Sequence, residues 1–272
     1  MRRPTWLIEA NVYGVDSQAL QDEIRHQGMT VQVVKPNVGA PPPRDLLGAE
    51  QLSPDGCVVF LGTLPVMEHI QRTKRWRPGG WCSFDKLSCS TYYSYFGPFL
   101  LNQNYTLLPC SEVIRHAKRL GSEFGKEGMV FIRPDTVRKI FKGAVVSAHA
   151  LEQALASARY DPTQLVLVAE PQEVVREWRL VVANGEVVAA SQYYEGGKVA
   201  RSAGCPSEVR AFAERALSSV SWRPDPLFVL DVCESQDELR LVELNSFSCS
   251  GLYECDKAAV ISAAAECASK TW

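Results

Sequence analysis

Short apolar runs separated by turn residues dominate the first third of the chain. Residues 6–9, 31–34 and 57–61 are rich in Val, Ile, Leu and Phe, which is typical of buried strands. Between the first two runs, a segment that starts at Asp16 or Ser17 and reaches Gln27 predicts a helix, and Gly28 ends it. This order of strand, helix, strand, loop and strand predicts a small α/β domain with parallel pairing.

Residues 80–110 show no clear period and are rich in aromatic side chains. Two interpretations stay open for this stretch. It is either a packed connection between domains or a surface that contacts a substrate.

The rest of the chain mixes strand and helix patterns, which predicts an α+β fold. Asn184-Gly185 lies between two alternating apolar runs and predicts a β-hairpin. The other expected strands are residues 129–133, 164–169, 228–231 and 241–245. The expected helices are residues 111–124, a helix capped by Ser147, 206–220 and 257–269.

Composition narrows the class of protein. The chain has 272 residues, 46% hydrophobic and 22% charged, as in ordinary globular proteins. A net charge of −2 gives no electrostatic footprint for nucleic acid or an anionic membrane, so we expect neither partner. Nine cysteines without a Cys-x-x-Cys motif indicate reduced thiols rather than a zinc knuckle. With no signal-peptide pattern and no apolar run near the roughly 18 residues of a membrane span, we expect a cytoplasmic protein.

Three oxygen-bearing side chains near the C-terminus predict a metal site. Asp231 follows the apolar run Phe228-Val229-Leu230, and Glu243 and Asn245 lie two residues apart on the next strand-like segment. Alternate strand residues point the same way, so these side chains can share one surface. Carboxylate and amide oxygens suit Mg²⁺, which takes the rest of its shell from water and nucleotide phosphates. The pattern therefore indicates a nucleotide-dependent enzyme.

The common phosphate-binding motifs do not supply the nucleotide site. The segment from Gly121 to Lys126 is one residue short of a P-loop, and Glu127 stands where Ser or Thr must bind Mg²⁺. No Gly-x-Gly-x-x-Gly follows a strand. A nucleotide would need a different cradle.

The order of the remaining charged residues offers one. Cations at Arg133 and Lys139 are followed by acids at Glu170 and Glu177, and then by the Asp231, Glu243 and Asn245 set. This order resembles the ATP-grasp superfamily, and most closely a divergent bacterial and phage clade with Arg in place of the first nucleotide-binding lysine. The motifs that carry the resemblance are Arg133-Pro134-Asp135, Lys139-Ile140-Phe141-Lys142-Gly143, Glu177-Trp178-Arg179 and Glu243-Leu244-Asn245-Ser246-Phe247. Many relatives carry a further lysine before the central domain, and here Lys86 is the nearest candidate.

The resemblance implies roles for these residues around ATP. Arg133 and Lys139 would neutralise the α and β phosphates, and Arg179 would reach the transferred phosphoryl group. These three cations are the expected catalytic residues. The same metal set would hold one or two Mg²⁺ ions. The expected adenine and ribose contacts are Glu170, Pro171, Glu173 and Glu177.

Several of these residues have simpler interpretations. Glu177 and Arg179 could pair with each other across a sheet surface, and Asn245 could cap a turn into Ser246. Lys142 competes with Lys139 for the phosphate role. Glu173 could be no more than an exposed hinge residue. Gln192, Tyr193 and Tyr194 either line an acceptor site or pack the hairpin, and Ser250-Gly251 resembles the family's substrate loop, in which N–H groups approach an anion.

The resemblance implies an ATP-grasp fold in three parts. These are an N-terminal α/β pre-grasp domain (1–108), a small central lobe (109–170) and a C-terminal α+β lobe (171–272), with the nucleotide between the last two. It implies an ATP-dependent carboxylate–amine ligase that works through an acyl phosphate on small-molecule or peptide substrates. A Mg·ATP-binding assembly protein with a protein partner and no ligase turnover is the alternative.

Overall fold

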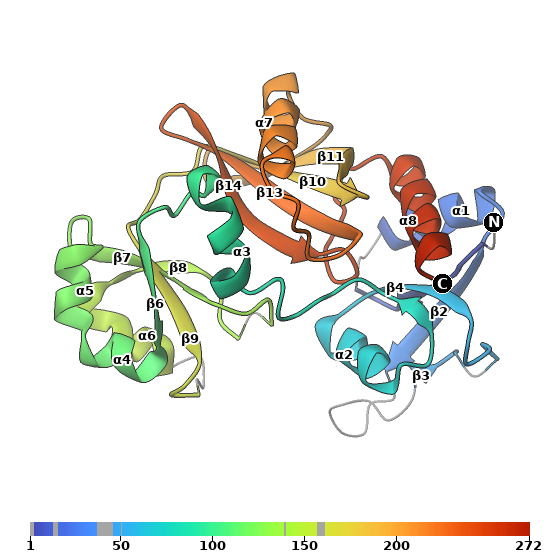
Figure 1. The fold of residues 1–272 in the computed structure, drawn as a ribbon, viewed down its shortest axis with the longest axis horizontal. Helices are drawn as coiled ribbons and strands as arrows, with labels where there is room; N and C mark the ends of the chain where they lie inside the picture. The colour runs from blue at the N-terminus through green and yellow to red at the C-terminus, as the bar shows by residue number, and fades with distance from the viewer. Residues whose placement is uncertain (1–2, 13–15, 37–45, 50, 139, 157–160) are drawn as a thin grey trace. The chain divides into compact units, whose positions relative to one another are not determined.

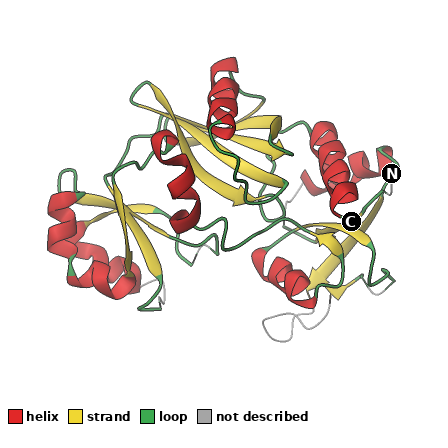
Figure 2. Cartoon of the chain, viewed as in Figure 1, coloured by secondary structure: helices red, strands yellow, loops and turns green. Residues whose placement is uncertain are grey.

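The computed structural model describes residues 3–12, 16–36, 46–49, 51–138, 140–156 and 161–272. Its strands form three sheets, which Figure 1 and Figure 2 show together with the helices. The chain divides into two compact units. Unit 1 consists of residues 1–83, 176–232 and 243–272, and unit 2 of residues 84–175 and 233–242. Each unit thus combines segments that are far apart in the sequence.

The first sheet of unit 1 has the strand order β3-β2-β1-β4-β5. Its central strand β1 is parallel to both neighbours, and Trp6 lies opposite Val31 on one side and Val59 on the other. The predicted parallel pairing is therefore confirmed. The strands are β1 (Thr5–Glu9), β2 (Thr30–Pro36), β3 (Leu46–Leu47), β4 (Cys57–Leu61) and β5 (Arg77–Gly79), and the helices are α1 (Asp16–His26) and α2 (Leu64–Thr73).

The second sheet has the order β12-β11-β10-β13-β14. The predicted hairpin of β10 and β11 is confirmed, and it turns at Asn184 and Gly185, whose φ values of 51° and 89° suit a tight hairpin turn. The C-terminal helix α8 contacts strands of both sheets of unit 1, so one apolar core serves them both. The strands are β10 (Arg176–Ala183), β11 (Glu186–Glu195), β12 (Lys198–Ala203), β13 (Leu227–Ser235) and β14 (Glu238–Ser246), and the helices are α7 (Ser207–Ser218) and α8 (Lys257–Thr271).

Unit 2 is built on an antiparallel sheet of order β6-β9-β7-β8. Its core joins Val130 and Ile132 from β7 to Leu120 and Leu151 from the helices. The strands are β6 (Tyr105–Pro109), β7 (Met129–Pro134), β8 (Ala144–Ser147) and β9 (Leu165–Ala169). The helices are α3 (Cys89–Phe96), α4 (Cys110–Arg115), α5 (Ala117–Glu123) and α6 (Leu151–Ala156), with 3₁₀ turns at Gly97–Phe99 and Ala148–Ala150.

Three sequence-based expectations were wrong in detail. The stretch 80–110 is more regular than predicted, because it contains α3 and β6. The helix expected over 111–124 is two helices, since His116 (φ −102°, ψ 16°) leaves the helical region between them. Strand β12 was not predicted because it is a largely exposed edge strand without an apolar alternation.

Two further features concern the chemistry that the chain can carry. All nine cysteines are described, and all are free thiols. Among the helices that the structure describes, none is long and apolar enough to cross a bilayer.

Candidate functional site

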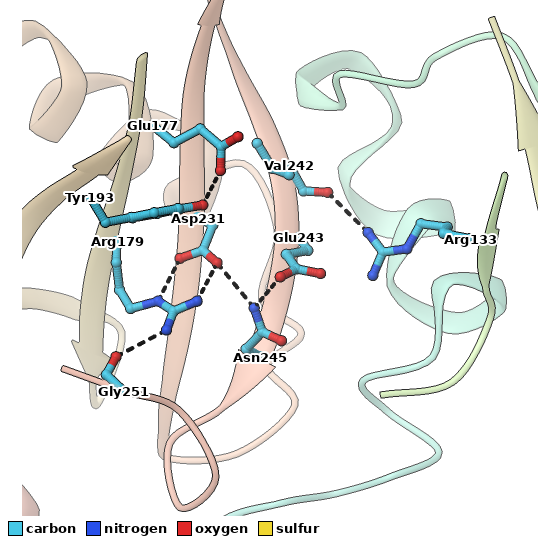
Figure 3. Close-up of polar contacts among 9 residues, drawn as sticks. All are labelled: Arg133, Glu177, Arg179, Tyr193, Asp231, Val242, Glu243, Asn245 and Gly251. Carbon is cyan, nitrogen blue, oxygen red and sulfur yellow. Dashed lines mark hydrogen bonds and ion pairs between the residues drawn. The ribbon is translucent and has the colours of Figure 1, made fainter. Parts of the chain in front are cut away.

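Three neighbouring strands of the second sheet of unit 1 bring polar side chains into one patch (Figure 3). Strand β10 supplies Glu177 and Arg179, β13 supplies Asp231, and β14 supplies Glu243 and Asn245. Residues two apart on a strand share a face, which places each pair on the same side of the sheet. The structure therefore brings together five of the residues that the sequence singled out.

The centre of the patch is a buried ion pair between Arg179 and Asp231. Arg179 Nε donates to Asp231 Oδ1 at 2.9 Å, and Nη2 donates to Oδ2 at 2.7 Å. The exposed fractions of the two residues are 6% and 0%. Burial acts to lower the pKa of the Arg179 guanidinium, but the carboxylate of Asp231 outweighs it and the pKa is raised. Arg179 thus pairs with Asp231, and not with Glu177 as the simpler interpretation had it.

Asn245 joins the two carboxylates of the patch. Its Nδ2 donates to Asp231 Oδ2 at 3.1 Å and to Glu243 Oε1 at 2.7 Å. The Asn245 side chain therefore orients both acids and does not cap a turn. The turn after β14 is closed instead by Ser246 Oγ, which accepts from the N–H of Cys249 at 3.2 Å.

A β-bulge on β11 aims Tyr193 at Glu177. Gln192 lies opposite Trp178 and Tyr194 lies opposite Glu177, which leaves Tyr193 as the extra residue of the strand. Its phenol donates a hydrogen bond to Glu177 Oε2. Burial raises the pKa of Glu177, and the hydrogen bond from Tyr193 partly offsets this. Of the three hairpin residues left open by the sequence, Tyr193 is the one that reaches the patch.

Tyr253, which the sequence did not single out, completes the cluster. Its ring stacks on Tyr193 with centroids 5.0 Å apart and an interplanar angle of 17°. The guanidinium carbon of Arg179 lies 5.5 Å from the Tyr193 centroid and 4.9 Å from that of Tyr253, within cation–π range. Tyr253 lies in a loop after β14, where no period or motif marks it.

The loop after β14 is hydrogen-bonded to the segments that follow β4 and β5. Ser248 Oγ accepts from the N–H of Trp81 at 2.9 Å, and the Ser248 carbonyl accepts from the N–H of Gly62 at 2.9 Å. The N–H of Ser250 donates to the Phe247 carbonyl at 3.3 Å. The Gly251 carbonyl accepts from Arg179 Nη1 at 2.9 Å. This loop therefore contacts Arg179 through the Gly251 carbonyl oxygen, and the approach of its N–H groups to an anion stays a prediction.

The expected phosphate-binding cations belong to unit 2. Arg133 lies on β7, and its Nη1 donates at 3.5 Å to the carbonyl oxygen of Val242, a residue of β14 that also belongs to unit 2. Figure 3 draws this contact. Lys139 lies outside the described residues. Lys142 is described and exposed. The choice between Lys139 and Lys142 as a phosphate ligand stays open.

The expected adenine contacts follow β9 in unit 2. Glu170 and Pro171 are half-buried, and Glu173 is exposed. The segment that contains them is held at its end by the N–H of Val175, which donates to the carbonyl of Glu234 at 2.9 Å.

The donor set fits Mg²⁺ in kind. Asp231 and Glu243 offer carboxylate oxygens and Asn245 an amide oxygen, all hard ligands. Among the described residues, no three His, Cys, Asp or Glu side chains gather to hold a metal. Water and phosphate oxygens would therefore complete the shell. Both oxygens of Asp231 accept hydrogen bonds from Arg179, so a cation there would meet a carboxylate whose charge is already partly neutralised.

The fold is that of the ATP-grasp superfamily. The family model described as ATP-grasp domain, R2K clade family 2, matches residues 112–263, more than half of the chain. The chain belongs to this family, which confirms the resemblance and the α+β ATP-grasp fold. No curated protein matches the chain.

Solved structures share the fold over the full length of the chain. D-cycloserine synthetase DcsG superposes with a TM-score of 0.65 at 14% identity and covers 98% of this chain and 99% of its own. D-alanyl-alanine synthetase A from Vibrio cholerae O1 biovar eltor str. N16961 has a TM-score of 0.64 at 14% identity, with coverages of 100% and 99%. The ATP-grasp ligase PsnB in complex with precursor peptide PsnA2 and AMPPNP has a TM-score of 0.56 at 14% identity, with coverages of 98% and 99%.

Proposed function

We propose that the protein is an ATP-dependent carboxylate–amine ligase. ATP phosphorylates a carboxylate, an amine attacks the resulting acyl phosphate, and the products are an amide or peptide-like bond, ADP and phosphate. The observation that carries this proposal is the cluster of Asp231, Glu243 and Asn245 beside the buried guanidinium of Arg179. Two carboxylates held together by an amide, next to a cation, suit a metal-bound polyphosphate better than a structural role.

The acidic cluster and Arg179 would divide the work of phosphoryl transfer. Asp231, Glu243 and Asn245 would hold Mg²⁺, which supplies positive charge to the phosphates when bound. Arg179 would stabilise the negative charge that develops on the transferred group. Its burial supports this role, because a fixed charge acts more strongly where water is excluded.

The remaining nucleotide contacts rest on the family. Arg133 and Lys139 would bind the α and β phosphates, where a guanidinium can bind two oxygens at once. Glu170, Pro171 and Glu173 would contact adenine. Glu177 would accept hydrogen bonds from the ribose hydroxyls, in place of the one it receives from Tyr193.

The solved relatives support both small-molecule and peptide substrates. Their titles name a D-cycloserine synthetase, a D-alanyl-alanine synthetase and a ligase bound to a precursor peptide. We therefore propose a small-molecule or peptide carboxylate and an amine as substrates.

Thermal unfolding with ATP, with Mg²⁺ and with both tests the nucleotide site. A ligand at about 100 times its Kd stabilises a protein by about 2.7 kcal/mol, which gives a clear rise in Tm. We expect the rise to need both ligands and to disappear in Glu243→Gln, which removes one ligand charge and keeps the size of the side chain. The matched control Glu238→Gln, at the exposed start of the same strand, keeps the rise.

Phosphate release then separates a ligase from a binding protein. Turnover that requires both an acid and an amine supports the ligase. Mg·ATP binding with a stable protein partner and no turnover would favour the assembly protein. The absence of any rise in Tm in the wild type would overturn the proposed nucleotide site itself.

A further inference from the structure

Arg201 on the edge strand β12 faces the candidate site. Gln192 lies opposite Ser202 and Tyr194 lies opposite Val199, so Arg201 and Tyr193 both fall in the irregular stretch of the β11–β12 pair. The guanidinium carbon of Arg201 lies 5.3 Å from the ring centroid of Tyr253, the ring that also contacts Arg179. One aromatic ring therefore connects two guanidinium groups.

The two guanidinium groups differ in charge balance. Arg179 is buried and neutralised by Asp231. Arg201 is exposed, and no acidic side chain among the described residues forms an ion pair with it. Arg201 thus offers a full positive charge and its N–H donors at the edge of the cluster.

The ring under Arg201 is held in place at a conformational cost. Tyr253 has a φ of 50°, a left-handed conformation that is unusual for a bulky residue and is found at functional sites when the surroundings enforce it. Here the stack on Tyr193 and the N–H of Glu254, which donates to Ser191 Oγ at 3.2 Å, fix the loop on both sides of the ring. A strained aromatic ring between two cations suits a binding platform better than a packing role.

The distance between the cations limits the size of a ligand that touches both. The guanidinium carbons lie 4.9 Å and 5.3 Å from the same Tyr253 centroid, so they are no more than about 10 Å apart. An extended chain spans about 3.3–3.6 Å per residue. A molecule of one to about three amino-acid residues can therefore place one group at Arg179 and another at Arg201.

We infer that Arg201, stacked on Tyr253, binds a carboxylate that the substrate carries in addition to its reacting group. The planar fork of a guanidinium matches the two oxygens of a carboxylate. The substrate class is then an amino acid, a short peptide or a small dicarboxylic acid. This inference rests on the proposed function, because Arg179 marks the reacting end.

Binding to the Mg·ADP complex tests this inference without any need for turnover. The probes are the amino acids in both chiral forms, their dipeptides and C2–C6 dicarboxylic acids, each with the matching amide. The readout is the rise in Tm of the Mg·ADP complex for wild type, Arg201→Gln, Arg201→Lys and Lys198→Gln. Lys198 is the matched control, because it lies on the same strand three residues away and so on the opposite face of the sheet.

We expect at least one acid to stabilise the wild type and Lys198→Gln, and its amide to stabilise neither. The apparent affinity of that acid should fall at least tenfold in Arg201→Gln and partly recover in Arg201→Lys. Equal stabilisation of the wild type and Arg201→Gln by every acid, or no stabilisation of the wild type by any acid, would overturn the inference. If Mg·ADP itself does not raise the Tm of the wild type, the result would instead count against the proposed function.

Discussion

Arg179 on β10 and Asp231 on β13 form a two-pronged ion pair that is almost completely buried. A further bond from Asn245 Nδ2 to Asp231 and one from Arg179 to the Gly251 carbonyl leave both charged groups well paired. A buried pair of this kind contributes little net stability, but the loss of one partner leaves an uncompensated charge. The pair therefore makes the site sensitive to single substitutions.

Removal of Arg179 should destabilise the fold. Arg179→Met leaves the Asp231 carboxylate buried without its counter-charge, which costs about 3–5 kcal/mol. Urea unfolding of both proteins at neutral pH measures the difference. The double variant Arg179→Met/Asp231→Leu should recover most of the loss, because it removes both charges together. If the free energy of unfolding of Arg179→Met lies within about 1 kcal/mol of that of the wild type, the ion pair is not intact in solution.

The bond between Tyr193 and Glu177 should make stability depend on pH. Burial raises the folded-state pKa of Glu177, and the phenol acts against this rise. The Glu177 carboxyl therefore stabilises the fold at pH values below its pKa in the unfolded chain. This stabilisation is lost as the pH rises through its pKa in the folded protein. The Tyr193→Phe substitution removes the hydrogen bond and so raises the pKa of Glu177 in the folded protein further. We expect it to destabilise the fold by about 1 kcal/mol at pH 7 and by less at pH 4, where the carboxyl is protonated more fully.

Unfolding in urea at several pH values from 4 to 7 measures this difference. In a Glu177→Gln background the Tyr193→Phe substitution should cost the same at every pH, because the titrating group is gone. A pH-independent cost in the wild-type background would mean that the phenol does not act on the Glu177 carboxyl.

The candidate metal ligands could be identified from the sequence because the pattern that marks them is local. Glu243 and Asn245 lie two apart on a strand, and Asp231 follows a fully buried apolar run, so each could be placed on a face before any pairing was known. The order of strands could not be placed in the same way. Arg179 and Asp231 are 52 residues apart, and only the position of β10 beside β13 brings them together.

The elements that the sequence missed depend on contacts from elsewhere in the chain. Helix α3 begins after Ser88, whose side chain makes no capping bond. Instead, Asp135 Oδ1 accepts from the N–H of Ser90 at 2.6 Å, and Oδ2 accepts from Ser90 Oγ at 2.9 Å. A cap that comes from 45 residues away leaves no start signal before the helix. Arg201 and Tyr253 likewise acquire their place only when β12 and the loop after β14 meet.

Loss of this distant cap should weaken unit 2. Asp135→Ala leaves the Ser90 N–H without its acceptor at a site where Asp135 is only 8% exposed, and should cost about 1–2 kcal/mol. Asp135→Asn keeps one acceptor oxygen and should cost less. Hydrogen exchange should be faster in α3 of Asp135→Ala than in that of the wild type. Unchanged exchange of α3 in Asp135→Ala would exclude Asp135 as its cap.

Arg179 should also compete with Mg²⁺ for Asp231. Both oxygens of this carboxylate accept hydrogen bonds from Arg179, so Mg²⁺ alone approaches a carboxylate whose charge the guanidinium already neutralises, whereas with ATP the guanidinium gains phosphate oxygens as new partners. Arg179→Gln should therefore bind Mg²⁺ alone at least tenfold more tightly than the wild type, a difference of about 1.4 kcal/mol. Titration calorimetry without nucleotide measures both affinities, and circular dichroism checks that the variant is folded. The double variant Arg179→Gln/Glu243→Gln should lose this gain in Mg²⁺ affinity, because it lacks the Glu243 carboxylate as a metal ligand. Equal Mg²⁺ affinity of wild type and Arg179→Gln would mean that Arg179 does not block Asp231.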